Sequence, residues 1–394
     1  MKILVINCGS SSIKFQLIDP SAMICLYKGT VQIPPEKADK NAYHKGISLA
    51  IDFLLKEKVI KNRNEIKLIG HRIVHGGEKY KKPTIINSAV IKEIRRLCDI
   101  APLHNPANLE GILACKKIFP RSKQIAVFDT AFYAAMPKKA YLYALPSFLY
   151  KKYGIRRYGF HGTNHEYVVS EALRLLKEKE GRAYAKKAKI VSCHMGNGIS
   201  ITASVNGRAI DTSMGFTPLE GVPMGTRSGD IDPAIPLYLI KKGIQAEKID
   251  DMLNHESGLE GLCGESDMKK ILEMARGRGS VISVRAKKSA KLALEILTYR
   301  ISKYIAAYAA AMNGIDTIIF TAGIGENAPM IRSMICKNLT YLDVKINEKL
   351  NKKNANMICD KSGNVYIFII PANEEKMIVK HVLTLTRAKN GKTM

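Results

Sequence analysis

The chain has 394 residues, of which 46% are hydrophobic and 25% are charged. This composition is that of a globular protein and excludes a disordered chain, and the length favours two domains over one. The formal net charge of +27 is compatible with a nucleic-acid-binding protein, but the basic residues are scattered along the chain. Their densest stretch, 269–303, has few interleaved aromatic residues and no known nucleic-acid motif. We therefore expect weak attraction to polyanions and no specific nucleic-acid partner.

Short apolar strands alternate with helical patterns along the chain, which is typical of an α/β fold. The predicted strands span 2–6, 13–18, 66–70, 124–128, 189–193, 199–205, 316–321 and 365–370. The predicted helices span 43–56, 88–98, 107–117, 164–178, 233–242, 286–312 and 328–337. No low-complexity linker separates the halves, and the stretch closest to a boundary is the proline- and tyrosine-rich segment 136–153.

Two segments share one pattern, in which a tight turn of glycine, serine or asparagine joins an apolar strand to a strand of alternating character. The first covers residues 7–16 and the second residues 194–203. Each predicts a hairpin whose turn directs backbone N–H groups and small side chains at one point, as a phosphate requires. Two such turns indicate a duplicated fold whose halves face each other across a polyphosphate.

A third glycine-rich segment, 318–327, runs from an apolar strand into a helix that begins near Pro329. Glycines before a helix N-terminus let the backbone approach a nucleotide. The segment matches neither G-x-G-x-x-G nor the Walker motif, so a plain strand-to-helix turn remains the alternative. The two hairpins favour the nucleotide site.

Four polar residues suited to phosphoryl transfer lie in loops or at strand ends, and these are Arg72, Asp129, His161 and Arg227. An arginine binds a carboxylate or phosphate through two parallel hydrogen bonds. Asp129 follows a strand, where α/β enzymes keep ligands and catalytic groups. The alternatives are surface ion pairs for the arginines, a helix cap for Asp129 and a structural hydrogen bond for His161.

The spacing of the cysteines and the lengths of the apolar runs predict where in the cell the protein is found. The eight cysteines form no C-x-x-C pair and no metal-finger spacing, which indicates reduced thiols in a cytoplasmic protein. The first apolar run ends at Ile6 and is too short for a signal peptide. The longest apolar tract, 304–324, is interrupted by Asn313, Gly314 and Asp316, so we expect no membrane span.

Together these segments resemble the acetate kinase family over residues 1–378. The matching segments are 7–14, 71–77, 101–106, 128–132, 159–163, 194–198, 212–221, 224–233, 321–327 and 371–375. The resemblance implies an α/β fold of two duplicated ribonuclease-H-like (actin-like) domains with the active site in a cleft between them. It implies a first domain at 1–145, with a C-terminal helix at about 373–394 packed back on it, and a nucleotide-binding second domain at 146–372 that forms a homodimer.

The resemblance implies Mg²⁺-dependent transfer of a phosphoryl group from ATP to acetate, which gives acetyl phosphate and ADP reversibly, with Mn²⁺ as a substitute metal. It assigns catalysis to Asp129, His161 and Arg227 and carboxylate binding to Arg72. A carboxylate nucleophile has no proton to lose, so we expect Asp129 to orient an arginine or a metal-bound water rather than to act as a general base. The implied metal ligands are Asn7 and Glu374.

The resemblance also implies the contacts of both substrates. The implied nucleotide contacts are Ser10, Ser12, Lys14, His194, Met195, Gly196, Asn197, Gly198, Asp267, Met268, Lys269, Gly323, Ile324, Gly325, Glu326 and Asn327. The methyl group of acetate would contact Val74, Leu103, Phe160 and Pro218. Related propionate kinases carry a smaller residue at the place of Val74. Acetate and propionate differ by one methylene, which is worth ~1–3 kcal/mol of discrimination between substrates. The family pattern ends in arginine where this chain has Lys269, and the segment is one residue shorter.

Two other functions are open to this sequence. One is a kinase for propionate or another short-chain carboxylate. The other is a nucleotide-dependent binding protein of the actin or chaperone kind, which shares the fold without the acid chemistry. The presence of Arg72, His161 and Arg227 argues against this second alternative, because those proteins lack these residues in these settings.

Overall fold

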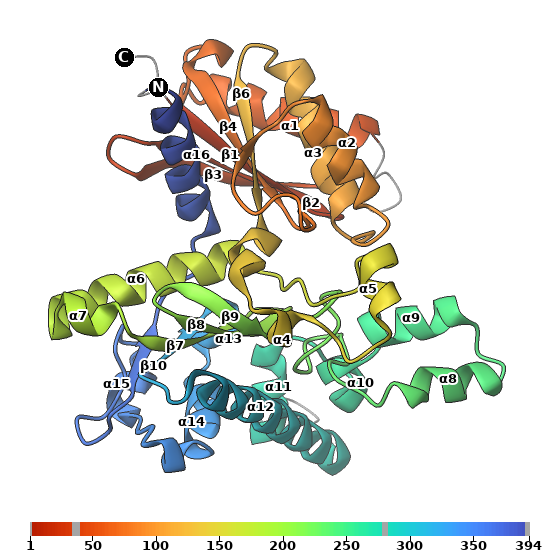
Figure 1. Ribbon diagram of the computed structural model, residues 1–394, viewed down its shortest axis with the longest axis vertical. Coiled ribbons are helices and arrows are strands. Elements are labelled where there is room, and N and C mark those ends of the chain that lie inside the picture. Colours follow the sequence, from red (N-terminus) through yellow and green to blue (C-terminus); the bar gives the residue numbers. More distant parts are fainter. Residues whose placement is uncertain (1, 34–39, 278–282, 391–394) are drawn as a thin grey trace. The chain divides into compact units, whose positions relative to one another are not determined.

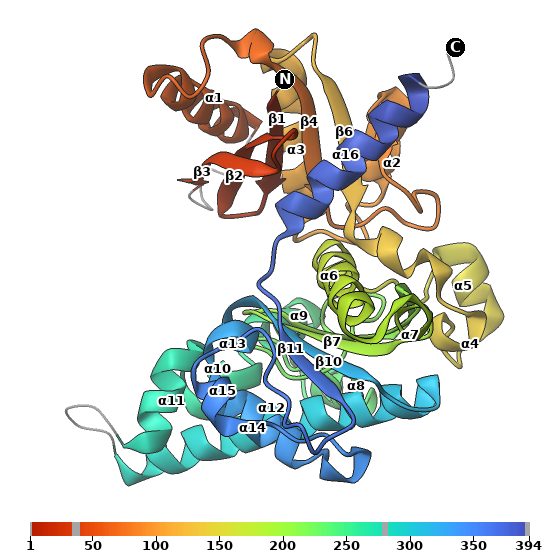
Figure 2. The same ribbon diagram turned by 90° about the vertical axis from the view of Figure 1, so that its left-hand side faces the viewer.

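The computed structural model describes residues 2–33, 40–277 and 283–390, and the chain divides into two compact units (Figures 1 and 2). The first unit comprises Met1–Ala134, Phe160–Tyr167 and Asn373–Met394, and the second comprises Ala135–Gly159 and Val168–Ala372. The expected boundary at 145/146 falls within Ala135–Gly159, which belongs to the second unit. The short stretch Phe160–Tyr167 belongs to the first unit, so the chain passes between the units two more times than the expected division at 145/146 and about 373 implies.

The first unit is built on a six-stranded sheet in the order β3-β2-β1-β4-β6-β5. The strands are β1 (Lys2–Cys8), β2 (Ser12–Asp19), β3 (Ile24–Gln32), β4 (Ile66–Ile73), β5 (Thr84–Ile85) and β6 (Lys123–Phe128). The first three form an antiparallel meander, β4 and β6 continue the sheet parallel to β1, and β5 pairs antiparallel with β6 at the edge.

Helices cover both faces of this sheet, because side chains alternate between the faces of a strand. Leu4 and Ile6 of β1 lie in one core cluster with residues of α1 (Lys40–Lys56) and α3 (Asn105–Ile118). Ile3 and Val5 lie in another cluster with Ile378, Val379 and Val382 of α16 (Glu374–Asn390). The helix α2 (Ser88–Arg96) and the short helices η2 (Arg63–Glu65) and η3 (Asp129–Ala135) complete the unit.

The second unit repeats this architecture with a five-stranded sheet in the order β11-β10-β7-β8-β9. The strands are β7 (Lys189–Met195), β8 (Ile199–Val205), β9 (Arg208–Thr212), β10 (Thr317–Thr321) and β11 (Tyr366–Ile369). The meander β7-β8-β9 is antiparallel, and β10 pairs parallel with both β7 and β11. In order and direction, β7, β8 and β9 correspond to β1, β2 and β3, and β10 and β11 correspond to β4 and β6. The prediction of a duplicated α/β fold is therefore confirmed.

The helices of the second unit are more numerous than those of the first. They are α4 (Lys138–Tyr141), α5 (Ser147–Tyr153), α6 (Gly162–Glu180), α7 (Arg182–Ala185), α8 (Ala234–Lys241), α9 (Ala246–His255), α10 (Gly258–Cys263), α11 (Met268–Arg276), α12 (Val284–Met312), α13 (Ala322–Asn327), α14 (Pro329–Lys337), η4 (Thr340–Leu342) and α15 (Glu348–Lys352). The long helix α12 packs on β7 and β8, and α6 begins in the stretch assigned to the first unit. None of the helices in the described ranges is long and apolar enough to cross a bilayer.

Each predicted strand and helix has a counterpart, with ends shifted by a few residues at most. The elements that sequence reasoning missed include β3, whose residues are mostly exposed and lack an apolar face. The glycine-rich segment after β10 was expected to be a loop but forms the helix α13. This helix includes Gly323 and Gly325 and ends at Asn327. Pro329 then begins the next helix, α14, at a position where proline is favoured.

Candidate active site

The β1–β2 hairpin of the first unit carries the predicted metal ligand Asn7 and the predicted phosphate contact Lys14, which face each other in register. The turn closes with a hydrogen bond of 2.8 Å from the Gly9 N–H to the Ser12 carbonyl. The side chains of Lys14 and Ser10 are exposed, and those of Asn7 and Ser12 are half-buried. The hairpin therefore presents accessible polar groups at its tip, as a phosphate contact requires.

Two asparagines of α3 hold the end of β1 and the segment after β4. Asn108 donates from Nδ2 to the Cys8 carbonyl (2.7 Å) and accepts from the Val74 N–H (3.0 Å). One turn earlier, Asn105 accepts from the His75 N–H (3.0 Å) and donates to the His75 carbonyl (3.1 Å). Both asparagines are buried. Sequence reasoning missed Asn108, because the predicted helix began at residue 107 and left out Asn105, which lies on the same face of α3 three residues earlier.

Arg72 and Asp129 form a buried ion pair in the first unit. Arg72 donates from Nη2 (2.8 Å) and Nε (3.2 Å) to Asp129 Oδ2, and Thr163 Oγ1 donates to Asp129 Oδ1 (2.6 Å). Burial works against the charged guanidinium, but the carboxylates of Asp129 and Glu374 raise the pKa of Arg72 above its usual value. Both oxygens of Asp129 are thus engaged, and Arg72 Nη1 is left on the side away from the pair.

The segment before α6 fits closely against Asp129. A Cβ atom on Gly162 would lie 1.9 Å from the Asp129 carbonyl oxygen, so only glycine fits at this position. His161 has a φ of +56°, a left-handed conformation that costs a non-glycine residue energy and is found preferentially at functional sites. His161 is half-buried, and its carbonyl accepts the first hydrogen bonds of α6. Sequence reasoning assigned no role to Gly162 or Thr163.

Glu374 and Glu375 begin α16 and are both half-buried. Burial, together with the charge of Glu374, raises the pKa of Glu375, whereas Arg72 and Lys14 lower it. Arg72 therefore lies within electrostatic reach of both carboxylates, and Lys14 lies within reach of Glu375. The described residues hold no cluster of three or more His, Cys, Asp or Glu that could bind a metal alone. Magnesium commonly binds one or two protein oxygens plus substrate phosphates, so a pair of carboxylates that repel each other fits this ion.

The residues predicted to contact the methyl group of acetate differ in exposure. Val74 is half-buried and Leu103 is 42% exposed, whereas Phe160 is 3% exposed and its ring lies 5.9 Å from that of His75. Pro218 belongs to the second unit. Val74 and Leu103 are thus accessible to a small molecule, and Phe160 can form only the inner wall of such a site.

The second unit contains a cavity of about 650 Å³ that joins three segments of the predicted nucleotide site. Its lining residues are Gly196, Asn197, Ser266, Asp267, Met268, Lys269, Leu272, Gly323, Ile324, Asn327 and Ala328. Most were predicted as nucleotide contacts, and Ser266, Leu272 and Ala328 were not. Their proximity comes from the fold, because the segments belong to a hairpin, to the start of α11 and to α13. The cavity is large enough for a purine and ribose.

Several residues predicted at this site lie outside the lining, namely His194, Met195, Gly198, Gly325 and Glu326. Met195 is fully buried in the β7–β8 pair. The Glu326 carboxylate accepts a hydrogen bond of 2.9 Å from the Ala372 N–H. These two side chains therefore hold the fold around the cavity.

A buried arginine missed by sequence reasoning supports α13. Arg332 of α14 is fully buried and donates from Nη1 to the Gly325 carbonyl (2.7 Å) and from Nε to Asn351 Oδ1 (2.7 Å). Burial lowers the pKa of Arg332 to about 10. Ala322, the first residue of α13, has a φ of +64°, so the helix begins with a strained residue. Arg332 fixes the helix that follows this bend.

The segment with Lys269 is ordered by side-chain caps. Asp267 accepts from the Lys269 N–H (2.8 Å) at the N-terminus of α11. Glu265 accepts from the N–H groups of Ser266 (3.0 Å) and Asp267 (2.9 Å) and pairs with Lys270 (3.0 Å). The shortened segment thus forms a capped turn beside the cavity, with the Lys269 side chain exposed.

Arg227 lies in the long irregular segment between β9 and α8. The backbone on either side is fixed by hydrogen bonds from the Ser257 N–H to the Thr226 carbonyl (2.9 Å) and from the Ser228 N–H to the Leu253 carbonyl (3.0 Å). Its guanidinium makes one long contact, 3.5 Å to the Pro218 carbonyl, and pairs with no carboxylate within the described part of the chain. Burial lowers the pKa of Arg227. A half-buried arginine that pairs with no carboxylate favours an anionic ligand.

Comparisons with known proteins agree with these features. The sequence model of the acetokinase family matches residues 2–380. The acetate kinase of Carboxydothermus hydrogenoformans is 46% identical over 408 aligned positions, which cover 98% of this chain and 99% of that protein. Two solved structures are similar in fold. A propionate kinase from Francisella tularensis is 39% identical with a TM-score of 0.87 and covers 97% of this chain and 99% of its own. Porphyromonas gingivalis acetate kinase is 37% identical with a TM-score of 0.86, and the match covers 98% of this chain and 99% of that protein.

The family match spans almost the whole chain, and the similar proteins align with it from end to end. The resemblance that the sequence motifs suggested is therefore confirmed. This chain belongs to the acetokinase family.

Proposed function

We propose that the chain is an acetate kinase, which transfers the γ-phosphoryl group of ATP directly and in line to the carboxylate of acetate and forms acetyl phosphate and ADP reversibly. The observation that carries this proposal is membership in a family of carboxylate-accepting phosphotransferases over almost the full chain. Arg72, His161 and Arg227 are all present, which disfavours the nucleotide-dependent binding protein. Phosphoryl transfer depends mainly on alignment and on positive charge around the moving group, and these residues supply both.

In this proposal Arg72 binds the acetate carboxylate. Asp129 occupies its Nε and Nη2 edge, so the guanidinium has one fixed orientation and can offer Nη1 to a substrate anion. Asp129 acts as the orienting group, since both its oxygens are already bonded and the nucleophile is a carboxylate that has no proton to lose. This arrangement supports the expectation that Asp129 is not a general base.

The negative charge of the transferred group is stabilised by the positive charge of Arg227 and by hydrogen-bond donation from His161. Arg227 is suited to this role because it is half-buried and pairs with no carboxylate among the described residues, so its charge is available to the phosphoryl oxygens. The adenosine occupies the cavity lined by Asn197, Met268 and Ile324. Lys14 and the tips of both hairpins contact the phosphates.

Asn7 and Glu374 are the proposed ligands of Mg²⁺, with Mn²⁺ as a substitute. The half-buried carboxylates at the start of α16 support this assignment, since they offer hard oxygen ligands within electrostatic reach of Arg72. When bound, the metal neutralises charge on the phosphates. Glu374→Gln is therefore expected to raise the Mg²⁺ concentration needed for half-maximal turnover, while the far exposed Glu57→Gln is expected to leave it unchanged. An unchanged Mg²⁺ requirement in Glu374→Gln would remove this residue from the metal site.

Acetate is the proposed preferred acid, and a propionate or other short-chain carboxylate kinase is the alternative. The similarity to a propionate kinase structure shows that the family fold accommodates either acid. Val74 favours acetate, because its branched side chain is accessible at the end of β4 and would restrict the space for a second methylene.

A homodimer formed through the second unit is proposed as well. The helix α8 exposes Leu237 (60%), Tyr238 (59%) and Ile240 (47%), and exposed apolar clusters of this kind mark protein interfaces. Light scattering should give the mass of two chains, and Leu237→Glu should give one. A wild-type monomer would refute this assignment. A cytoplasmic location is proposed because all eight cysteines, which lie in the described part of the chain, are free.

The direct test measures both directions of the reaction. ADP formation from ATP should depend on acetate and on Mg²⁺, and ATP formation should occur from ADP and acetyl phosphate. ATP hydrolysis that acetate does not change, with no reverse reaction, would favour the nucleotide-dependent binding protein instead.

A further inference from the structure

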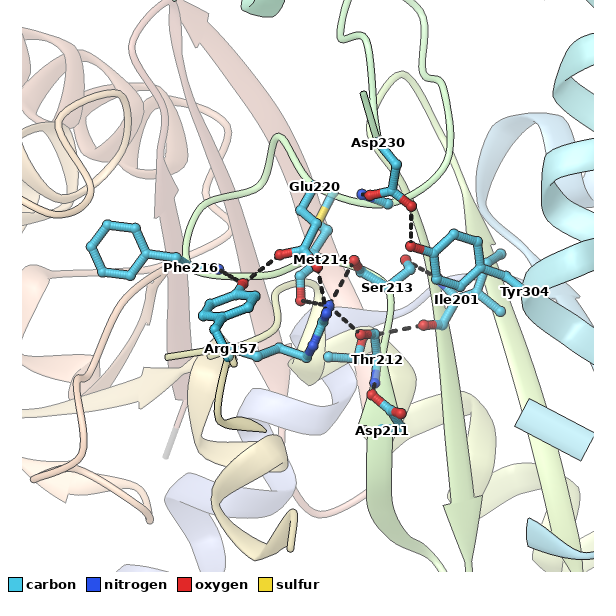
Figure 3. A network of polar contacts seen from close by, with 12 residues as sticks. Arg157, Ile201, Asp211, Thr212, Ser213, Met214, Phe216, Glu220, Asp230 and Tyr304 are labelled. Carbon is cyan, nitrogen blue, oxygen red and sulfur yellow. Dashed lines mark hydrogen bonds and ion pairs between the residues drawn. The ribbon is translucent and has the colours of Figure 1, made fainter. Parts of the chain in front are cut away.

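Residues 213–233 connect β9 to α8 without forming a helix or a strand, and they carry both Arg227 and Pro218. A segment of this length loses much conformational freedom on folding, and its buried backbone groups need partners. The side chains that supply these partners therefore decide where Arg227 is held. Arg157 and Tyr304 come from other parts of the second unit, whereas Glu220 and Asp230 belong to the segment itself (Figure 3).

Arg157 connects the two ends of the first part of this segment. Its Nη1 donates to three carbonyls where β9 ends, those of Thr212 (2.9 Å), Ser213 (3.0 Å) and Met214 (3.4 Å). Its Nη2 donates to Oε1 of Glu220 (Figure 3). One guanidinium thus closes a ring of residues from Thr212 to Glu220.

Tyr143 supports the same ring from a second direction. Its hydroxyl donates to Oε2 of Glu220 and accepts a hydrogen bond of 2.8 Å from the Phe216 N–H. Both oxygens of Glu220 are therefore engaged, one by Arg157 and one by Tyr143. A Cβ atom on Gly215 would lie 1.6 Å from Glu220 Oε2, which shows how tightly the carboxylate fits inside the ring.

A second ring follows directly and contains Arg227. The Gly221 N–H donates to Asp230 Oδ1 (2.8 Å), and the Asp230 N–H donates to the Gly221 carbonyl (2.8 Å). Tyr304 of α12 donates its hydroxyl to Asp230 Oδ2. The first ring ends at Glu220 and the second begins at Gly221, so a displacement of Glu220 is transmitted to the base of the loop with Arg227.

The ion pair inside the first ring is mostly shielded from water. The side chain of Arg157 is 17% exposed and that of Glu220 is 29% exposed. Burial opposes the charge on Arg157, but the Glu220 carboxylate raises its pKa above the usual value. Burial and the charge of Glu220 also raise the pKa of Tyr143, so its hydroxyl keeps its proton. A charge pair in this environment resists rearrangement, because separating it leaves a buried charge unpaired.

We propose that Glu220, held by Arg157 and Tyr143, is a positioning residue for phosphoryl transfer, which sets the place of Arg227 through the two connected rings. This inference rests on the proposed function, in which Arg227 stabilises the transferred group. Both oxygens of Glu220 are already bonded to Arg157 and Tyr143, so we assign it no contact with a substrate. Its effect should therefore appear in kcat and should depend on the presence of Arg227.

The test compares Glu220→Gln with the matched control Glu178→Gln, which removes an exposed ion pair with Arg174 elsewhere in the second unit. Glu220→Gln keeps the size of the side chain but loses the charge that organises both donors. A misplaced charged group costs on the order of 10²-fold in rate, so we expect a loss of this size in kcat with an unchanged KM for ATP. Tyr143→Phe removes one hydrogen bond and should lose roughly ten-fold or less. Glu178→Gln should match the wild type.

A double substitution separates positioning from general structural damage. In an Arg227→Lys background, where the guanidinium is already gone, Glu220→Gln should cost far less than it does in the wild type, since groups that act together are not additive. An equal loss in both backgrounds would overturn the inference, as would wild-type kcat in Glu220→Gln. If Glu220→Gln does not fold, Tyr143→Phe in the two backgrounds gives the same comparison. Failure of the proposed function would appear separately, as a wild-type protein without acetate-dependent turnover.

Discussion

The two units share one strand order but differ in what they place on it. In the first hairpin Asn7 pairs with Lys14, and in the second His194 pairs with Ser200 at the equivalent position. Lys14 is exposed, whereas Ser200 is fully buried. The first hairpin thus presents a cation at its tip, and the second presents backbone and small side chains next to a cavity.

The same contrast extends through both units. The first unit brings together Arg72, Asp129 and the carboxylates at the start of α16. The second unit forms the cavity of about 650 Å³ and holds Arg227, which pairs with no carboxylate among the described residues. In the proposed function, one scaffold would therefore support two different tasks, with charge around the acid in the first unit and space for the nucleotide in the second. The variants below test whether these tasks are separable.

Arg72→Ala should have the largest effect. It removes the proposed acetate contact and leaves Asp129 buried without its partner, so acetate-dependent turnover should fall by about 10³-fold or more. ATP affinity should change little, because the cavity is lined by the second unit alone. Steady-state kinetics and nucleotide binding measured together check this. Arg63→Ala, which breaks an exposed ion pair with Asp52, is the control. Equal losses of turnover and ATP affinity would contradict the division of tasks.

Gly162→Ala tests the support of the acid side. The new Cβ would overlap the Asp129 carbonyl oxygen at 1.9 Å, so the variant should lose about 3 kcal/mol of stability and much of its turnover. Gly323→Ala in α13 is the matched change in the second unit, where no heavy atom lies within 4 Å of the added Cβ. Its stability should not fall, since alanine favours a helix by about 1 kcal/mol. Thermal unfolding of both variants decides the point, and equal stability would show that the backbone near Gly162 yields easily.

Arg332→Met tests the nucleotide side. It leaves the Gly325 carbonyl and Asn351 without their donor, which should cost roughly 2 kcal/mol and loosen α13 beside the cavity. We expect a raised KM for ATP with a smaller change in the KM for acetate. Arg208→Met on the exposed surface of β9 is the control. A variant that loses acetate affinity but keeps ATP affinity would oppose the role given to α13.

Val74→Ala should have the smallest effect. Removing two methyl groups enlarges the space for the acid, so the ratio of kcat/KM for propionate to that for acetate should rise about ten-fold. The nucleotide parameters should stay the same. No change in the ratio would mean that Val74 has only a structural role and that another residue limits the size of the acid.

Much of the fold followed from the sequence, because apolar periodicity marks buried elements such as β7, β8 and α12. Exposed β3 carried no such signal. Glycine was interpreted as loop, whereas α13 is a helix supported by buried Arg332. A residue type alone does not reveal that a charged side chain is buried, since burial depends on partners distant in the sequence.

The candidate site divides in the same way. Residues in distinctive motifs, such as Arg72 and Asp129, were identifiable, and the structure shows that these two form a pair. Their supports, Asn108, Gly162 and Glu220, were not identified, because each acts through contacts with segments far away in the chain. Met195 was expected to contact the nucleotide, but its side chain is buried in the sheet. The alternation of strand side chains could have indicated this.

The most direct test of the whole account is formation of the acyl phosphate from ATP and Mg²⁺, trapped as the hydroxamate, with acetate, propionate and butyrate compared at two salt concentrations. The account predicts the fastest turnover with acetate, slower turnover with propionate and the slowest with butyrate, in the same order at both salt concentrations. Absence of product with all three acids, in a protein that still binds ATP, would contradict it.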